Sequence, residues 1–355
     1  SIASGGNYNV VVGDEAGTAI TTGDENTFIG YATGDANTTG ANNVAIGSDA
    51  LGRNTTGADN TALGRTSLAF NTTAADNTAV GYASLGANTT GASNVAIGSL
   101  ALDANTTASY ITAVGEKALS ANTTGAKNTA LGRATLQAIT TQSNNTAVGY
   151  NALSGGSNTG SDNTAVGMDA LTSTTTGIQN TAVGSIALDA NTTGSSNTAV
   201  GEGALSANTT ASNNVAIGQD ALQSNTTGAN NTSTGVNSLG SNTTGASNVA
   251  VGFLALDANT TAAENTAVGT SSMSATTTGA SNAAFGTDSL AANTTGASNT
   301  ALGAYSLDAN TTASNNTAVG VHSLGANTTG TQNVAVGQNA GAAVTTGTRN
   351  TIVGT

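Results

Sequence analysis

The sequence predicts an all-β fold, a parallel β-solenoid (β-roll or β-helix) of about twenty 17-residue coils. A word of the form Asn-[Thr/Val]-Ala-[Val/Ile/Leu]-Gly recurs along the chain, and its closing Gly keeps one constant spacing that is lengthened by a single residue once. Ala, Asn, Thr and Gly dominate the composition, with no Trp and four Phe, so one large globular core is not expected. A thin core repeated coil after coil accounts for all of these observations.

One coil is represented by residues 82–98, which read Tyr-Ala-Ser-Leu-Gly-Ala-Asn-Thr-Thr-Gly-Ala-Ser-Asn-Val-Ala-Ile-Gly. A coil of this length cannot hold two helices and a turn, and Asn, Thr and Gly at this density oppose any long helix. Val-Ala-Ile suits a short strand, whereas Gly-Ala-Ser-Asn suits a bend. The absence of Pro fits coils that hydrogen-bond to the coils on both sides.

The domain prediction is a single continuous solenoid over residues 1–355, with atypical end coils at 1–34 and 338–355. The one extra residue falls within 154–160, where other coils have a shorter bend around Asn-Thr-Thr-Gly. We expect it to enlarge a loop and to leave the flanking strands in register.

Strand alternation divides the repeated word into two faces. The residue before the closing Gly is apolar in all coils but one, so we expect it to point inward, and a Leu four residues after the Gly is expected to close the core from the opposite wall. The predicted core residues are Ile46, Leu51, Val80, Leu85, Ile97 and Leu102.

The Ala in the middle of the word would then face away from its own core. It is Ala in seventeen of twenty-one words, whereas a solvated face favours polar side chains. This pattern predicts that another copy of the chain packs against Ala147, Ala165 and Ala182, and therefore a homo-oligomer.

Asn begins twenty of the twenty-one words, and a second Asn precedes Thr-Thr in fourteen coils. An amide repeated at one coil position can bond its neighbours in the coils above and below. Asn60, Asn77 and Asn94 are therefore predicted to form a structural ladder.

The sequence contains no pattern that predicts a catalytic, cofactor-binding or metal site, so we expect no enzyme. His322 is the only histidine, and it is expected to be solvated because a general base needs partners. Asp103, Asp189, Asp257 and Asp308 recur at one coil position, but they lack a calcium-binding motif and are expected to be solvated bend charges.

Charge and hydropathy narrow the range of partners. The formal net charge is −13, which repels a phosphate backbone, so nucleic acid is not an expected partner. No apolar run approaches the roughly 20 residues needed to span a bilayer. Variable side chains gather in the two positions after each closing Gly, and this edge is the expected place for any recognition.

The repeated words resemble those of a known family. Asn43-Val44-Ala45-Ile46-Gly47 and Asn94-Val95-Ala96-Ile97-Gly98 are similar to the head repeats of trimeric autotransporter adhesins. The longer unit over 197–210 resembles repeats of bacteriophage tail-fibre and related bacterial surface proteins. The resemblance covers practically the whole chain and implies a trimeric left-handed parallel β-roll, displayed on a surface and attached to a host cell or substratum.

We therefore predict the adhesive rod of an extracellular attachment fibre, either a phage tail fibre or a bacterial surface adhesin. Its expected partners are further copies of itself and a host-surface receptor or glycan. Two alternatives are an ice-binding solenoid, suggested by the Thr ladders, and a self-polymerising filament subunit, suggested by a repeat that runs to both ends of the sequence.

Overall fold

The fold of the chain is a parallel β-solenoid of about twenty coils, seen in a computed structural model. The structure describes residues 6–156 and 159–354, and these residues form strands, turns and bends without any helix. The chain forms two compact units, Ser1–Ile178 and Gln179–Thr355. The single solenoid over 1–355 stays a prediction.

Each coil of either unit contributes one short strand. The strands of the first unit are β1 (Val10–Val12), β2 (Thr27–Ile29), β3 (Val44–Ile46), β4 (Thr61–Leu63), β5 (Thr78–Val80), β6 (Val95–Ile97), β7 (Thr112–Val114), β8 (Thr129–Leu131), β9 (Thr146–Val148) and β10 (Thr164–Val166). Those of the second are β11 (Thr181–Val183), β12 (Thr198–Val200), β13 (Val215–Ile217), β14 (Thr232–Thr234), β15 (Val249–Val251), β16 (Thr266–Val268), β17 (Ala283–Phe285), β18 (Thr300–Leu302), β19 (Thr317–Val319), β20 (Val334–Val336) and β21 (Thr351–Val353).

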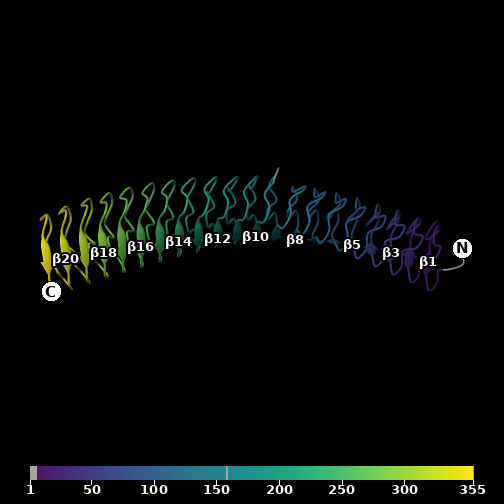
Figure 1. Cartoon of the computed structure of the whole chain (residues 1–355), viewed down its shortest axis with the longest axis horizontal. Helices are drawn as coiled ribbons and strands as arrows, with labels where there is room; N and C mark the ends of the chain where they lie inside the picture. The colour runs from purple at the N-terminus through teal and green to yellow at the C-terminus, as the bar shows by residue number, and fades with distance from the viewer. Residues whose placement is uncertain (1–5, 157–158, 355) are drawn as a thin grey trace. The chain divides into compact units, whose positions relative to one another are not determined.

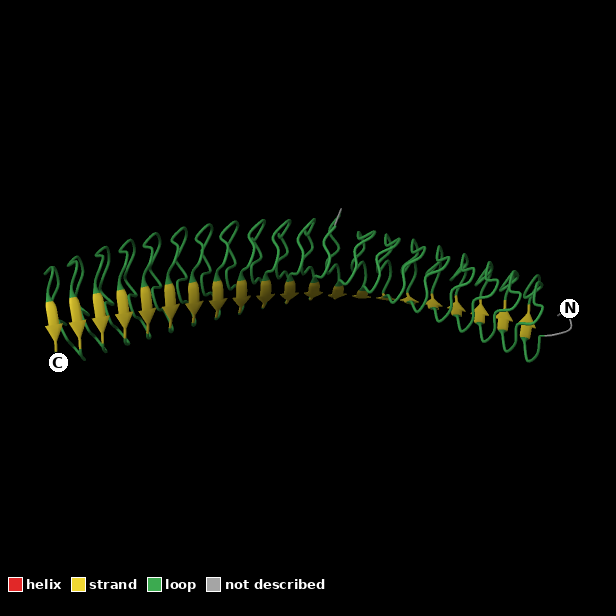
Figure 2. Cartoon of the chain, viewed as in Figure 1, coloured by secondary structure: helices red, strands yellow, loops and turns green. Residues whose placement is uncertain are grey.

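Within each unit the strands pair in parallel with the next strand along the chain. In the first unit β1 to β10 pair in sequence, and in the second unit β11 to β21 do the same. Successive coils of a unit therefore stack one on the next (Figure 1), with the strands along one side and loops and turns around the rest (Figure 2).

We number the positions of a coil from 1 to 17, starting after the closing Gly, so that Tyr82 is at position 1 and Gly98 at position 17. The strand occupies positions 14 to 16. Backbone N–H groups bond to neighbouring coils in both directions: Leu85 donates to the Ala101 carbonyl at 2.9 Å, and Gly98 donates to the Val80 carbonyl at 2.7 Å. Each interior coil is therefore held by backbone hydrogen bonds to the coil before it and to the coil after it.

Glycine at position 17 is required by the backbone. Gly98 has a φ of +134°, which side-chain-bearing residues rarely adopt, and a Cβ there would lie 2.5 Å from the Gly115 carbonyl oxygen. Because successive coils approach so closely at this corner, Gly is needed at position 17 of each coil, and it therefore recurs once in every repeat.

The core lies between position 15 of the strand and position 4. Leu51, Leu85 and Leu102 are fully buried at position 4, where the sequence places them. Facing them, the strand buries its middle residue: Ala45, Ala79 and Ala96 are likewise inaccessible to solvent.

Two predictions about the strand faces are therefore wrong. Ile46 and Ile97 at position 16 are 37% and 39% exposed, and Val80 is half-buried, so these three side chains lie outside the core. Ala147, Ala165 and Ala182, expected at a contact between chains, are 0% exposed inside their own coil. Alternation identified correctly which residues share a face, but the two faces were exchanged.

The width of the coil is the physical reason. With Leu at position 4 only a methyl group fits opposite, so the strand must turn Ala inward and leave its larger side chains outside. Phe28 demonstrates the size rule: it is fully buried at position 15 where the neighbouring position-4 residues are Gly17 and Gly34. A Cβ on Gly34 would come within 2.7 Å of the Phe28 ring. Ile352 and Gly341 repeat this exchange, with a Cβ on Gly341 2.9 Å from the Ile352 side chain.

Two buried Asn ladders complete the interior. At position 13, the Asn43 Oδ1 accepts the backbone N–H of Asn60 at 3.0 Å, and Asn77 and Asn94 continue the same pattern. At position 7, the Asn88 Nδ2 donates to the Asn71 Oδ1 at 3.0 Å. The amides satisfy the backbone of the bends, which would otherwise be buried without partners.

The coil that carries the extra residue keeps its strand in register. Ala165 of β10 lies opposite Ala147 of β9, as in coils of ordinary length. The insertion predicted within 154–160 includes Ser157 and Asn158, which lie outside the described residues.

Candidate functional site

The outer face of each sheet is formed by the side chains of positions 14 and 16, and the position-16 row is apolar along nearly its whole length. Position 14 is Thr or Val in nearly every strand, and position 16 is Val, Ile, Leu or Phe in all strands but β14. Away from the end coils, position-16 side chains that are 37–49% exposed include Ile46, Leu63, Ile97, Leu131, Ile217, Phe285 and Leu302. Each unit therefore presents to solvent an aliphatic row at position 16 beside a row at position 14 that is Thr in fourteen of the twenty-one strands.

Positions 1 and 2 form the corner beside the outer face, where side chains from successive coils contact one another. Arg133 forms an ion pair with Glu116 at 3.2 Å and lies over the Tyr150 ring, with 5.8 Å between its Cζ and the ring centroid. His322 stacks on Tyr305 with their ring centroids 4.9 Å apart. Position 2 has a left-handed backbone even where it bears a side chain, which turns these groups outward.

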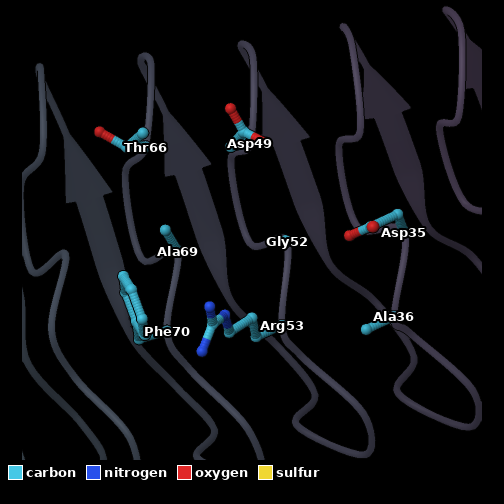
Figure 3. Close-up of a pocket in the computed structure, with 8 residues that line it drawn as sticks. All are labelled: Asp35, Ala36, Asp49, Gly52, Arg53, Thr66, Ala69 and Phe70. Carbon is cyan, nitrogen blue, oxygen red and sulfur yellow. The ribbon is translucent and has the colours of Figure 1, made fainter.

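Position 6 carries Ala or Ser in most coils, but two successive coils of the first unit have Arg53 and Phe70 there. The Arg53 Cζ lies 4.2 Å from the centroid of the Phe70 ring, a cation–π contact. Figure 3 shows the ring edge-on, with one face toward Arg53 and the other away from it.

A hollow lies on each side of this ring. The Arg53 hollow has a volume of about 360 Å³ and is lined by Asp35, Ala36, Asp49, Gly52, Arg53, Thr66, Ala69 and Phe70 (Figure 3). The Phe70 hollow has a volume of about 340 Å³ and is lined by Thr66, Ala69, Phe70, Ala83, Gly86, Ala87 and Asp103. Both are open because Arg53 and Phe70 stand beside small residues: Ala36 and Gly52 border the first hollow, and Gly86 and Ala87 border the second.

An Asp at position 5 borders each hollow. Asp35 lines the first, Asp103 lines the second, and Asp308 lines a third of about 360 Å³ in the second unit. The side chain leans over the next coil, since a Cβ on Gly325 would lie 3.2 Å from the Asp308 Oδ1. In every case the following coil has Gly or Ser at position 5.

Burial raises the pKa of these carboxyl groups. For Asp103, Asp257 and Asp308 desolvation is the largest cause, and hydrogen bonds from backbone N–H groups oppose it. One oxygen of each, Oδ1, is buried without a hydrogen-bond partner. The expectation that these are freely solvated bend charges is therefore wrong: they are half-buried.

A metal site and a membrane-spanning helix are two other features that the described residues could contain. Within residues 6–156 and 159–354, no group of three or more His, Cys, Asp and Glu side chains lies close enough together to hold a metal ion. No helix in this part of the chain has the length and apolar character of a membrane span.

Neither a family model nor any curated protein matches the chain. The resemblance of its words to adhesin-head and tail-fibre repeats therefore stays a prediction from the sequence. The sequence pattern does not by itself predict the Phe70 hollow, although it contains a signal for it, because Arg53 and Phe70 interrupt a row of small residues.

Proposed function

We propose that this chain is a structural and adhesive segment of an extracellular attachment fibre, from a phage tail or a bacterial surface, and that it acts as a homo-oligomer. The observation that carries the proposal is the exposed apolar row at position 16 on the outer face of the stacked coils. Monomers rarely leave a contiguous apolar patch of more than about 300–600 Å² in water. Burying an aliphatic side chain of this size is worth about 1.5–3 kcal/mol.

A second copy of the chain is the partner that fits this face best. The rows repeat with the coil spacing, about 4.8 Å, so only a partner with the same spacing can cover them continuously. The trimer that the resemblance implies would place three outer faces around one axis. This contact replaces the one predicted through Ala147, Ala165 and Ala182.

Ice binding is less well supported by the side chains. The hydroxyl groups of the first Thr in each Asn-Thr-Thr word bond within the chain: Thr89 Oγ1 donates to the Thr106 carbonyl at 2.9 Å, and Thr106 Oγ1 donates to the Thr123 carbonyl at 3.2 Å. The outer face is also uneven in height, with Phe285 and Thr234 at the same position. Such a face suits an interdigitating protein partner more than a flat crystal plane.

The mass of the particle in solution tests self-association. We expect the unmodified chain to exceed the 33.8 kDa of one copy, as measured by sedimentation equilibrium. Replacing Ile97, Val114 and Leu131 at position 16 by Asp should yield folded monomers, because charges in a desolvated contact cost several kcal/mol.

A matched variant carries the same three charges elsewhere. Thr90, Thr107 and Thr124 are exposed at position 9, and changing them to Asp should leave the mass unaltered. A monomeric unmodified chain would contradict the proposal, as would equal masses for both variants. Mass that grows without limit with concentration would indicate a filament subunit instead. Retention of labelled protein on bacterial or epithelial cells, measured by flow cytometry, tests attachment.

A further inference from the structure

We propose that the Phe70 hollow is a saccharide-binding subsite, which takes a pyranose ring against the free face of Phe70 and hydrogen-bonds it to Asp103. The inference rests on the attachment role proposed above and names the chemical class of the receptor. Three observations support the inference: the exposed ring of Phe70, the hollow beside that ring, and the Asp103 carboxyl group on the far side of the hollow.

The ring of Phe70 is held ready for stacking. Its side chain is 45% exposed, although a free phenyl group on the surface would ordinarily fold against its neighbours. The Arg53 Cζ lies 4.2 Å from the ring centroid and covers one face of the ring. This contact holds the ring plane roughly perpendicular to the direction in which the coils stack. The opposite face points toward the next coil, where position 6 is Ala87.

The space beyond that face has the size of one sugar ring. Phe70 and Asp103 belong to coils two steps apart, so they are separated by about 9.6 Å along the stack. Carbon–carbon contact with the phenyl face takes about 4 Å of this. The remaining distance is about 5–6 Å, and it is lengthened because the Asp103 carboxyl group leans away from Phe70, toward the next coil. This space holds the body of a pyranose and one hydrogen bond of about 2.7 Å.

The polarity of the hollow suits a neutral polyhydroxyl ligand. Asp103 is half-buried with its Oδ1 enclosed, so its other carboxylate oxygen, Oδ2, is the one that can accept a hydrogen bond from a sugar hydroxyl group, and Thr66 adds a hydroxyl group at the near side. The chain as a whole carries a net charge of −13, which disfavours an anionic ligand. The axial C–H groups of a β-pyranose supply the apolar face that stacks on an aromatic ring.

The test uses methyl β-D-galactopyranoside and methyl β-D-glucopyranoside with the full chain, followed by saturation-transfer NMR. We expect millimolar binding of at least one of them. Phe70→Ala should weaken binding about tenfold or more through loss of the stacking surface. Asp103→Asn should weaken it about three- to tenfold, because a hydrogen bond to a charged acceptor is replaced by one to a neutral amide.

Two further variants separate the site from general effects. Ala87→Leu leaves Phe70 and Asp103 in place but fills the hollow, and should abolish binding. Phe253→Ala removes a similarly exposed phenyl group, 50% exposed, outside the hollow and should leave binding unchanged. Circular dichroism confirms that each variant is folded.

The proposal is overturned if neither pyranoside binds the unmodified chain at about 50 mM, a concentration well above the range of weak affinities. It is equally overturned if Phe70→Ala or Ala87→Leu binds as well as the unmodified chain. Either result would leave the particle mass and the cell-attachment experiments untouched. A failure of this subsite is therefore distinguishable from a failure of the attachment role.

Discussion

At the scale of single residues, the position-5 aspartates connect burial to pH. In the folded chain the pKa of Asp103, Asp257 and Asp308 is raised, chiefly because burial disfavours the charged carboxylate. A raised folded-state pKa means that the native state binds the proton more tightly than the unfolded state does. The stabilisation from these groups is thus present below the unfolded pKa and is lost as pH rises through the folded pKa.

Replacing Asp103, Asp257 and Asp308 together by Asn should therefore raise the melting temperature at pH 7 and leave it nearly unchanged at pH 3, where the parent carboxyl groups are already protonated. Thermal unfolding followed by circular dichroism at both values checks this. A control, Asp76→Asn, removes an exposed carboxylate at position 12 and should show a smaller gain at pH 7. Equal gains per substitution would mean that net charge, and not burial, governs the effect.

The half-burial of these aspartates could not be predicted from the sequence alone. Their recurrence at one position was visible, but their exposure depends on a neighbour one coil further along the chain. The useful signal was the Gly or Ser that follows each of them in the next coil, since a small residue there gives the carboxyl group room to lean over.

At the scale of strands and ladders, three features could be predicted from the sequence: the length of the repeat, the buried Leu at position 4 and the rows of Asn. Each of them follows from a residue type that recurs at one coil position. The sequence did not decide which strand face is inside. Alternation shows which residues share a face of the strand, but it does not show which face is buried. The prediction placed the larger position-16 side chains in a core that is too narrow for them. The pairing of Phe28 with Gly17 and Gly34 was the observation that could have decided it.

The position-7 ladder is interrupted wherever the next coil lacks Asn at this position. The last Asn before each interruption then has an Oδ1 atom that accepts no hydrogen bond. Asn122, Asn259 and Asn327 have a buried Oδ1 without a partner. The next residues of the ladder are Ile139, Thr276 and Val344, none of which carries an amide. An unsatisfied buried acceptor costs about 1–3 kcal/mol.

Thr276→Asn should restore this ladder in the second unit. The new amide can donate to the Asn259 Oδ1 and accept from Asn293, whose present contact with the Thr276 hydroxyl is long at 3.4 Å. We expect a gain of about 1 kcal/mol in the free energy of unfolding, measured by urea denaturation. Thr276→Val, which is similar in shape but has no amide, should give no gain. The reciprocal change Asn242→Thr should create the same defect in an intact ladder and destabilise the chain. A loss on Thr276→Asn would contradict the ladder as a source of stability.

At the scale of the whole molecule, stability is distributed over coils and the interfaces between them. Each interior coil contacts the coil before it and the coil after it through the same backbone hydrogen bonds. In such an arrangement the free energy of unfolding is close to a sum of coil and interface contributions. The sequence predicted this modularity from its period, whereas the hollow beside Phe70 depends on side chains in three successive coils and was not predicted.

Deletions of one coil test this modularity. Removing 82–98 deletes one whole coil and should give a folded chain, since every remaining interface is of the same kind. Removing 90–105 deletes one residue fewer than a coil and leaves the extra residue in the loop at positions 8 and 9, within the segment where the natural longer coil has its extra residue. This variant should also fold.

Removing 83–98 is a deletion of the same size as 90–105, but it leaves the extra residue in the tight turn after Gly81. In the unmodified chain this turn is closed by a hydrogen bond from the Ser84 N–H to the Gly81 carbonyl at 3.4 Å. We expect a loss on the order of 2 kcal/mol, which lowers the melting temperature by about 3 °C relative to the loop variant. Differential scanning calorimetry measures the difference. If the turn variant and the loop variant melt alike, the turn at positions 17 to 3 does not fix the coil.

The hydrogen bonds between coils also give each unit a mechanical direction. They run along the stack, from Leu85 to Ala101 and from Val95 to Ile111 for example, and the Asn amides run beside them. A pull along the stack loads all the bonds of one interface together, so the force is divided among them. A pull on one edge of a coil opens them one after another, and each in turn carries the whole force. A segment built in this way is strong under tension along its stack and weak against peeling.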